Sequence, residues 1–157
     1  MQTIIPFLWF DGQAEEAAEF YTSIVKDSKI LKISRYGDVG PGPKGTAMTV
    51  DFELKGQEFV ALNGGPVFAF TPAVSFMINC ADQEEVDYLW KKFTEEGKES
   101  QCGWLTDKFG LSWQITPVRL RQLLEDTDPK KAGRVMQAMI KMKKINIAAL
   151  EEAYNGS

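Results

Sequence analysis

The sequence contains no histidine among its 157 residues. Histidine is the side chain whose unperturbed pKa lies nearest neutrality, so imidazole acid–base catalysis is excluded. Activation of a serine or cysteine nucleophile by a neighbouring imidazole is excluded for the same reason. A metal site with histidine ligands cannot be built either. Any chemistry of this chain must therefore depend on other groups.

Cysteine and long apolar runs are also scarce. Cys80 and Cys102 are the only cysteines, too few for a disulfide framework or a thiolate metal site, so we expect free thiols in a reducing compartment. No apolar run is long enough for a transmembrane helix. Residues 1–6 lack the basic and apolar regions of a signal peptide. We therefore expect a cytoplasmic protein without a membrane partner.

The charge and composition indicate what kind of protein this is. A net charge of -4 argues against nucleic acid or an anionic membrane as the main partner. A hydrophobic content of 44% with 25% charged residues is ordinary for a soluble globule. The length suits a single domain with a full core, and we predict that residues 1–157 form one.

The first half of the sequence reads as a strand, a helix and three further strands. Residues 3–10 are mostly apolar, and residues 29–36, 46–54 and 58–62 have strand composition. Between them, apolar residues at spacings of three and four predict a helix that covers a sheet. The residues of this helix face are Ala14, Ala17, Ala18, Tyr21, Ile24 and Val25.

The second half repeats this order. Residues 74–80 predict a strand, and Asp82 followed by Glu85 predicts a capped helix start. The buried stripe of this helix is expected at Val86, Leu89, Trp90 and Phe93, before strands near Glu99 and at 104–106 and 111–116. We interpret the chain as two βαβββ units; the alternative is that any two amphipathic helices look alike.

The units are expected at residues 1–66 and 67–117, with a helical tail at 118–157. Leu120, Leu123 and Leu124 indicate a short helix. Asp128–Pro129 starts another, whose inner face is expected to carry Val135, Met136 and Met139. Asn146 caps a last helix, with Ile145 and Leu150 placed as a hydrophobic staple. The tail packs on its own sheet or on a partner, and the sequence leaves both open.

Several motifs carry a resemblance to a known family. They are PFLWFDG at 6–12, LNGG at 62–65 and the block from Cys102 to Pro117, which includes CGWL and WQI. Over about residues 3 to 155 the chain resembles the PhnB-like branch of the vicinal oxygen chelate (glyoxalase/bleomycin-resistance) superfamily. Proteins of this branch often carry the label 3-demethylubiquinone-9 3-methyltransferase. The sequence does not support that label, because no glycine-rich loop follows the first strand.

The resemblance implies an α+β fold in which two βαβββ units form a glyoxalase/bleomycin-resistance-like open barrel with C-terminal helices. In metal-dependent relatives the ligands come from the first and last strands of each unit. On this chain those positions fall at Ile5, Val60, Ser75 and Gln114. Two are aliphatic, and a serine and a neutral amide are poor ligands for a transition metal. We therefore expect neither a metal nor another cofactor.

Strand alternation sorts the residues around the implied cleft. Leu8, Phe10, Ile78 and Cys80 are expected on the helix side. The alternate residues of the same strands are expected to face the cleft, together with Ser112 and Thr116 of the last strand. The predicted ligand-binding residues are Phe7, Trp9, Asn63, Ser75, Met77, Asn79, Cys102, Trp104 and Gln114. Aromatic and apolar groups with a few neutral amides are typical of a small-molecule pocket. The alternative is that Phe7 and Trp9 fill the cleft.

These observations favour a metal-free protein that holds a small hydrophobic or aromatic compound, and we expect it to form a homodimer. The alternative is an enzyme of unknown reaction, including the methyl transfer of the family label. Cys102 is a candidate nucleophile or redox-sensitive thiol, although Gln101 and Gly103 supply no positive charge to lower its pKa. Residues 38–45 form either a lid or a plain connector. Glu53, Glu58 and Asp107 are expected to be solvated or turn residues.

Overall fold

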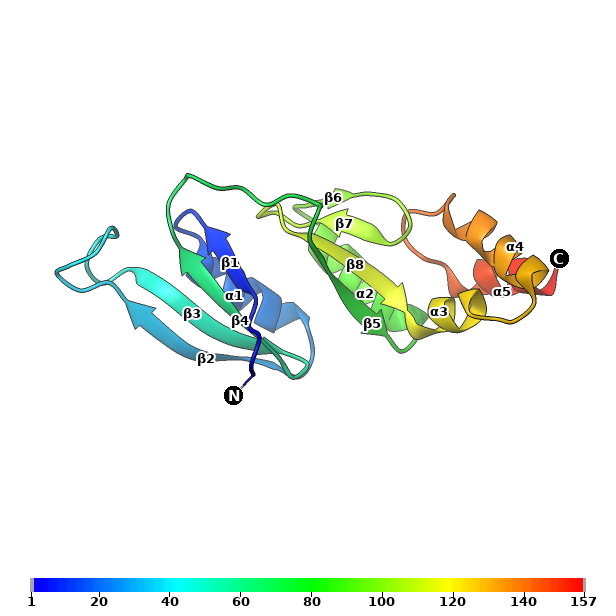
Figure 1. Ribbon diagram of the computed structural model, residues 1–157, viewed down its shortest axis with the longest axis horizontal. Coiled ribbons are helices and arrows are strands. Elements are labelled where there is room, and N and C mark those ends of the chain that lie inside the picture. Colours follow the sequence, from blue (N-terminus) through cyan, green and yellow to red (C-terminus); the bar gives the residue numbers. More distant parts are fainter. Residues whose placement is uncertain (1, 157) are drawn as a thin grey trace. The chain divides into compact units, whose positions relative to one another are not determined.

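The computed structural model describes residues 2–156. It divides into two compact units, with the boundary between residues 70 and 71. This boundary lies a few residues after the expected one, and the helical tail belongs to the second unit. Each unit contains a four-stranded sheet with a helix against one face (Figure 1).

The elements of the two units follow the same order. The first unit contains β1 (Phe7–Phe10), α1 (Ala14–Ile24), β2 (Ser28–Arg35), β3 (Ala47–Leu54) and β4 (Gln57–Asn63). The second contains β5 (Ser75–Cys80), α2 (Gln83–Thr94), β6 (Lys98–Glu99), β7 (Trp104–Thr106) and β8 (Ser112–Pro117). The strand orders are β1-β4-β3-β2 and β5-β8-β7-β6. The first strand is parallel to the last in both sheets and the other pairs are antiparallel. The predicted repeat is confirmed.

The register places the same positions side by side in each unit. Phe7 pairs with Val60 in the first sheet, and Met77 pairs with Gln114 in the second. Ile5 and Ser75 each lie two residues before these first-strand residues. Val60 and Gln114 are therefore equivalent positions, as the resemblance implied.

Helix α1 packs against its sheet as its spacing predicts. Ala14, Ala17, Ala18, Tyr21 and Ile24 are buried. The alanines allow the helix backbone to lie close to the sheet, while the Tyr21 ring stacks on Phe52 of β3 with ring centroids 6.0 Å apart. Burial of each such aromatic side chain contributes about 2 to 3 kcal/mol to the hydrophobic free energy of folding.

Helix α2 starts at the predicted cap. The Asp82 carboxylate accepts a hydrogen bond from the Glu85 N–H at 2.9 Å. The return bond differs from the capping box, because Glu85 accepts from the N–H of Ala81, one residue before the cap. Val86, Leu89, Trp90 and Phe93 form the buried stripe, and Phe93 packs on Trp113 of β8.

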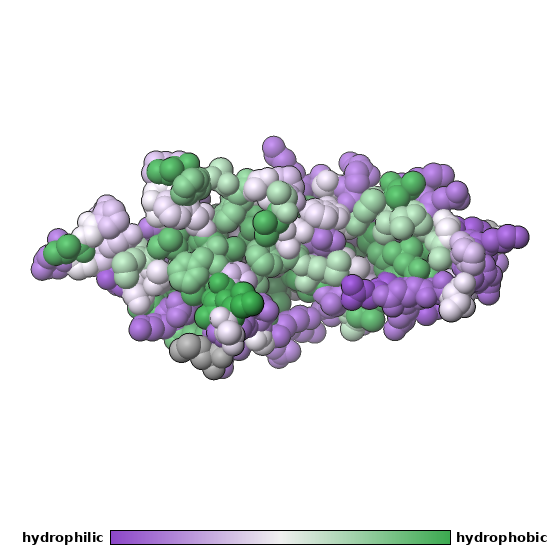
Figure 2. Space-filling model, viewed as in Figure 1, coloured by the Kyte–Doolittle hydropathy of each residue, from purple (hydrophilic) through white to green (hydrophobic). Residues whose placement is uncertain are grey.

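Strand alternation separates the two faces of each sheet as expected. Leu8, Phe10, Ile78 and Cys80 are buried under the helices. By contrast, Phe7 and Met77, whose side chains lie on the other face of their sheets, are 62% and 45% exposed. We call the face away from the helix the open face of its sheet. In Figure 1, β8 passes in front of α2. Figure 2 has the same view and therefore looks onto the open face of the second sheet, with apolar surface beside the more hydrophilic tail.

The tail consists of α3 (Val118–Leu124), α4 (Pro129–Met139) and α5 (Ile147–Asn155). Asp128 and Asn146 cap α4 and α5 as predicted. Leu120, Leu123, Val135, Ile145 and Leu150 form a buried cluster, which agrees with the expected staple of Ile145 and Leu150. The prediction for Met136 was wrong: it is 44% exposed, because the inward stripe of α4 runs through Val135 and Met139. No helix among residues 2–156 is long and apolar enough to cross a membrane.

Candidate functional site

A hollow of about 310 Å³ lies in the second unit, between the open face of its sheet and the tail. The lining from the sheet side is Met77, Asn79, Cys102, Trp104, Gln114 and Thr116, and the lining from the tail is Leu120, Arg121, Leu124, Glu125 and Met139. We call the first set the floor and the second set the wall. The structure thus brings together most of the site residues predicted in this unit.

Adjacent strands align the floor. Met77 and Trp104 both pair with Gln114, and Asn79 pairs with Thr116, so these residues share one face of three neighbouring strands. Nε2 of Gln114 donates to Oγ of Ser75 at 2.9 Å, which fixes the orientation of the amide. Ser75 therefore supports the floor from just outside the lining. Within residues 2–156 the side-chain amide of Asn79 makes no hydrogen bond and is exposed.

The wall was missed by the sequence reasoning, although a signal for it exists. Pro117 ends β8 and is also the N-terminal cap of α3, so the helix begins directly beside the floor. Helical spacing then places Leu120 and Leu124 on one face, with Arg121 and Glu125 next to them. Because the expectation left the partner of the tail open, this face was not connected to the cleft.

Side chains of α2 hold the tail in place. Gln83 donates from Nε2 to the Ile145 carbonyl at 2.9 Å, and its Oε1 accepts from the Ile147 N–H at 2.7 Å. The Lys144 ammonium lies 2.8 Å from the Asp87 carboxylate. Hydrogen bonds from Lys144 and then Gln83 lower the pKa of Asp87 below its ordinary value. In this structure the tail is therefore anchored to α2 of its own chain.

The turn that carries Cys102 connects the sheet to the tail. The Cys102 N–H donates to the Met142 carbonyl, and the Gly103 N–H donates to the Lys143 carbonyl, both at 2.8 Å. Cys102 has a positive φ of 59°. At Gly103, with φ +82°, an added Cβ would lie 3.0 Å from the Ile115 carbonyl oxygen and 3.1 Å from Ile145. The positive φ and the close packing at Gly103 therefore favour glycine there. The backbone of Cys102 thus helps to hold the tail, and the reactivity of its thiol stays a prediction.

The first unit holds Phe7 and Trp9 on its open face. The Trp9 indole N–H donates to the Gly65 carbonyl at 2.9 Å, and Phe68 makes an edge-on ring contact at 5.0 Å. The Trp9 ring also lies over Gly64, where an added Cβ would come within 2.4 Å of the ring. Trp9 is thus held by the segment after β4, whereas Phe7 is exposed. Their contact with a ligand stays a prediction.

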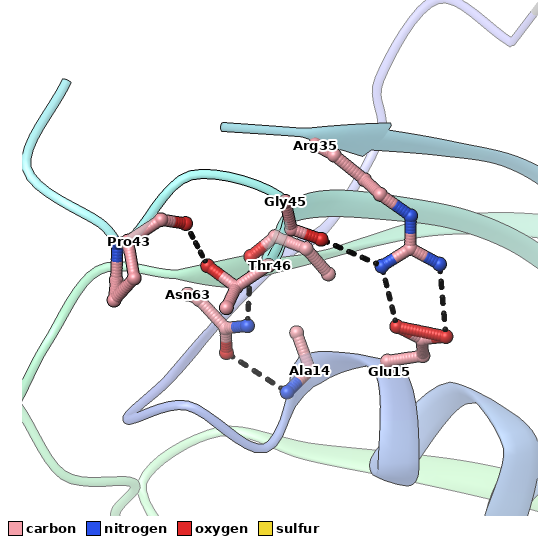
Figure 3. Close-up of polar contacts among 8 residues, drawn as sticks. Ala14, Glu15, Arg35, Pro43, Gly45, Thr46 and Asn63 are labelled. Carbon is pink, nitrogen blue, oxygen red and sulfur yellow. Dashed lines mark hydrogen bonds and ion pairs between the residues drawn. The ribbon is translucent and has the colours of Figure 1, made fainter. Parts of the chain in front are cut away.

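Asn63 lies on the helix side of the first sheet (Figure 3). Its Oδ1 accepts from the Ala14 N–H at 2.9 Å, and its Nδ2 donates to the Ala47 carbonyl at 3.0 Å. The same close-up shows Arg35 bonded to Glu15 of α1. The amide oxygen thus positions the start of α1, and the amide nitrogen is used by the start of β3. This placement separates Asn63 from the open face and gives its predicted ligand contact no support.

The loop at 38–45 folds back on Tyr36. The Gly45 N–H donates to the Tyr36 carbonyl at 2.8 Å, and the Tyr36 hydroxyl donates to the Asn63 carbonyl at 2.8 Å. An added Cβ at Gly42 would lie 2.1 Å from the Tyr36 ring. These contacts explain the loop as a connector packed within its own unit.

The residues at the metal-ligand positions of the superfamily do not fit a transition metal. The side chains of Ile5 and Val60 have no atom that could bind a metal. Ser75 and Gln114 are hydrogen-bonded to each other, and neutral hydroxyl and amide groups are poor ligands. Among residues 2–156 no group of three cysteine, aspartate or glutamate side chains is arranged to hold a metal ion.

Comparison with known proteins identifies relatives of the chain. The sequence profile of the family described as 3-demethylubiquinone-9 3-methyltransferase matches residues 2–116. A PhnB protein from Bacillus cereus is 41% identical with a TM-score of 0.70, covering 74% of this chain and 100% of its own. A Pseudomonas aeruginosa protein is 20% identical with a TM-score of 0.63, covering 74% of this chain and 98% of its own.

A more distant structure shares the fold. The fosfomycin resistance protein FosX of Listeria monocytogenes is 10% identical with a TM-score of 0.51, covering 74% of this chain and 93% of its own. No curated protein matches this chain.

The family match ends before the tail begins. Its last residue is 116, whereas the resemblance was expected to run to about residue 155. The floor of the hollow thus lies entirely in the matched segment, and the wall lies outside it. The chain belongs to the 3-demethylubiquinone-9 3-methyltransferase-like family, with a PhnB protein among its relatives.

Proposed function

We propose that this protein binds a small organic molecule in the hollow of the second unit, and that it does so without a metal. The observation that carries this proposal is the lining of the hollow. Apolar side chains are contributed by Met77, Trp104, Leu120, Leu124 and Met139, and neutral polar ones by Asn79, Gln114 and Thr116. Mostly apolar walls with a few placed polar groups are the usual makeup of a ligand pocket.

The size and polar groups indicate the kind of ligand. A volume of about 310 Å³ is near the lower end of the range for ligand pockets. Trp104 offers an aromatic face, while the amides of Asn79 and Gln114 offer donors and acceptors that fix orientation. A small hydrophobic or aromatic compound with a carbonyl, hydroxyl or amide group fits this arrangement.

The competing function is an enzyme. The family label names a methyl transfer, but the connection from β1 to α1 (Asp11, Gly12 and Gln13) contains a single glycine and cannot form a dinucleotide-type phosphate loop. Cys102 is the thiol at the hollow, and within the described residues it has no hydrogen bond to a base. Binding without a reaction is therefore the function that we favour.

Metal analysis combined with a thermal-shift screen tests this proposal. We expect less than about a tenth of an equivalent of zinc, nickel, iron or manganese after dialysis, because neutral oxygen and aliphatic groups occupy the ligand positions. We also expect small aromatic compounds to raise the melting temperature equally with and without a chelator. One equivalent of retained metal, with binding that is lost on chelation, would favour the enzyme.

For the first unit we propose a role in self-association. Phe7 and Ile4 are exposed apolar residues there, and exposed apolar surface of this kind is commonly covered by a second subunit. Sedimentation equilibrium at micromolar concentration is expected to give twice the chain mass of 17.6 kDa. A single species at the chain mass would show that the protein is a monomer.

A further inference from the structure

We propose that the ligand of the hollow is an organic anion, whose charged group is bound by Arg121 at the wall. This inference rests on the proposed function and specifies its ligand class. Arg121 and Glu125 are the charged residues of the lining, and all the other lining residues are uncharged. The hollow therefore has an apolar and amide-bearing interior and a single site for positive charge.

The position of Arg121 suits a charged group. Its side chain is 71% exposed, so it lies where the hollow meets solvent. A carboxylate or sulfonate bound there keeps part of its hydration, while the apolar body of the ligand enters between Met77 and Met139. An anion placed deeper would be costly, because the inner lining offers no positive charge to compensate for its desolvation.

Arg121 is available because its present ion pair is weak. Its Nε lies 3.5 Å from Glu125 Oε1, and both side chains are largely exposed. The arginine precedes the glutamate by four residues, which is the less favourable order on a helix. Exposed pairs of this kind add little stability. A ligand anion that accepts two parallel hydrogen bonds from the guanidinium can therefore replace Glu125.

The other arginines near the tail are committed to the fold. Arg119 forms hydrogen bonds to both carboxylate oxygens of Glu151. Arg134 donates to the carbonyls of Ala153 and Tyr154 at 2.8 and 2.7 Å. Arg121, by contrast, makes no comparable bond to the backbone within residues 2–156. Its guanidinium is the one at the hollow that can accept a new partner without loss of a structural contact.

Arg121 also lies beyond the segment shared with the family, which ends at residue 116. The preference for an anion is accordingly a property that the tail adds to the floor.

Two fluorescent probes separate recognition of charge from recognition of shape. 8-Anilinonaphthalene-1-sulfonate is an anion, and N-phenyl-1-naphthylamine has the same ring system without the sulfonate. Titration of the whole protein should give about tenfold weaker binding of the anion in Arg121→Gln, the loss expected for charge-assisted hydrogen bonds. The affinity for the neutral probe should change by less than about twofold. Glu125→Gln should bind the anion about threefold more tightly, because a repelling carboxylate is removed.

Lys91→Gln is the matched control, since it removes one positive charge from α2, on the opposite face of the second sheet. It should leave both affinities unchanged. An equal loss for both probes in Arg121→Gln, or no loss for either, would overturn the anion site while the binding function stands. If neither probe binds the unaltered protein, the proposed function and the anion site both fail.

Discussion

Replacement of Asp107 by alanine is expected to destabilise the second unit by about 3 to 5 kcal/mol. Asp107 was expected to be a solvated or turn residue, and it is a turn residue that is only 3% exposed. Its carboxylate accepts hydrogen bonds from the N–H groups of Phe109 and Leu111 at 2.8 and 3.0 Å, and from the Trp113 indole at 2.8 Å. Alanine would leave these donors without an acceptor in a buried turn.

Urea denaturation followed by tryptophan fluorescence measures this effect, because Trp90, Trp104 and Trp113 all lie in the second unit. Asp107→Asn should cost about 2 kcal/mol, since its amide oxygen can still accept from the turn while the indole loses its partner. Asp38→Ala is the control. Asp38 is exposed and pairs with Lys44 at the surface, so a change within about 0.5 kcal/mol is expected. Equal effects of Asp107→Ala and Asp38→Ala would show that the buried bonds do not stabilise the unit.

Met77→Trp should lower the affinity for a neutral naphthyl probe more than about tenfold, or about 1.4 kcal/mol. Met77 lies on the floor, on the open face of β5, and its side chain is partly exposed. The larger indole would occupy the space that the ligand needs. Because tryptophan is well accommodated in strands, the fold itself should change little in stability.

Met48→Trp is the matched control for this substitution. Met48 lies on β3 of the first unit, is also partly exposed, and is absent from the lining of the hollow. Fluorescence titration of the two variants should show a loss of affinity only in Met77→Trp. Equal affinities in both variants would place the binding site elsewhere.

The fold could be predicted from the sequence because its signals are local. Apolar spacing identified the buried stripes of α1 and α2, and Asp82, Asp128 and Asn146 each cap a helix where the sequence indicates. The first strand was predicted too long, starting at residue 3, whereas β1 starts at Phe7. Pro6 has no N–H to donate to the neighbouring strand. Its carbonyl still accepts a hydrogen bond from the Val60 N–H.

The candidate site was predictable only in part, for a physical reason. Strand parity depends on a period of two and therefore gave the floor residues Met77, Asn79 and Gln114. Parity alone could not show that the Asn63 amide is used to fix the start of α1, or that a glycine segment holds Trp9. These are long-range contacts. The wall also depends on where the tail packs. Gln83 fixes that position through hydrogen bonds to Ile145 and Ile147, which lie more than sixty residues later in the chain.

The most direct test of a ligand site in the hollow is methyl NMR of the protein labelled with ¹³C at its methionine methyl groups. Met77 and Met139 line the hollow from the floor and the wall, whereas Met48 and Met136 are exposed and lie outside the lining. Titration with N-phenyl-1-naphthylamine should produce saturable shifts of the Met77 and Met139 methyl signals with one common dissociation constant, while those of Met48 and Met136 stay in place. Unmoved signals of Met77 and Met139 at saturating probe, or shifts confined to Met48 and Met136, would contradict a binding site between the second sheet and the tail.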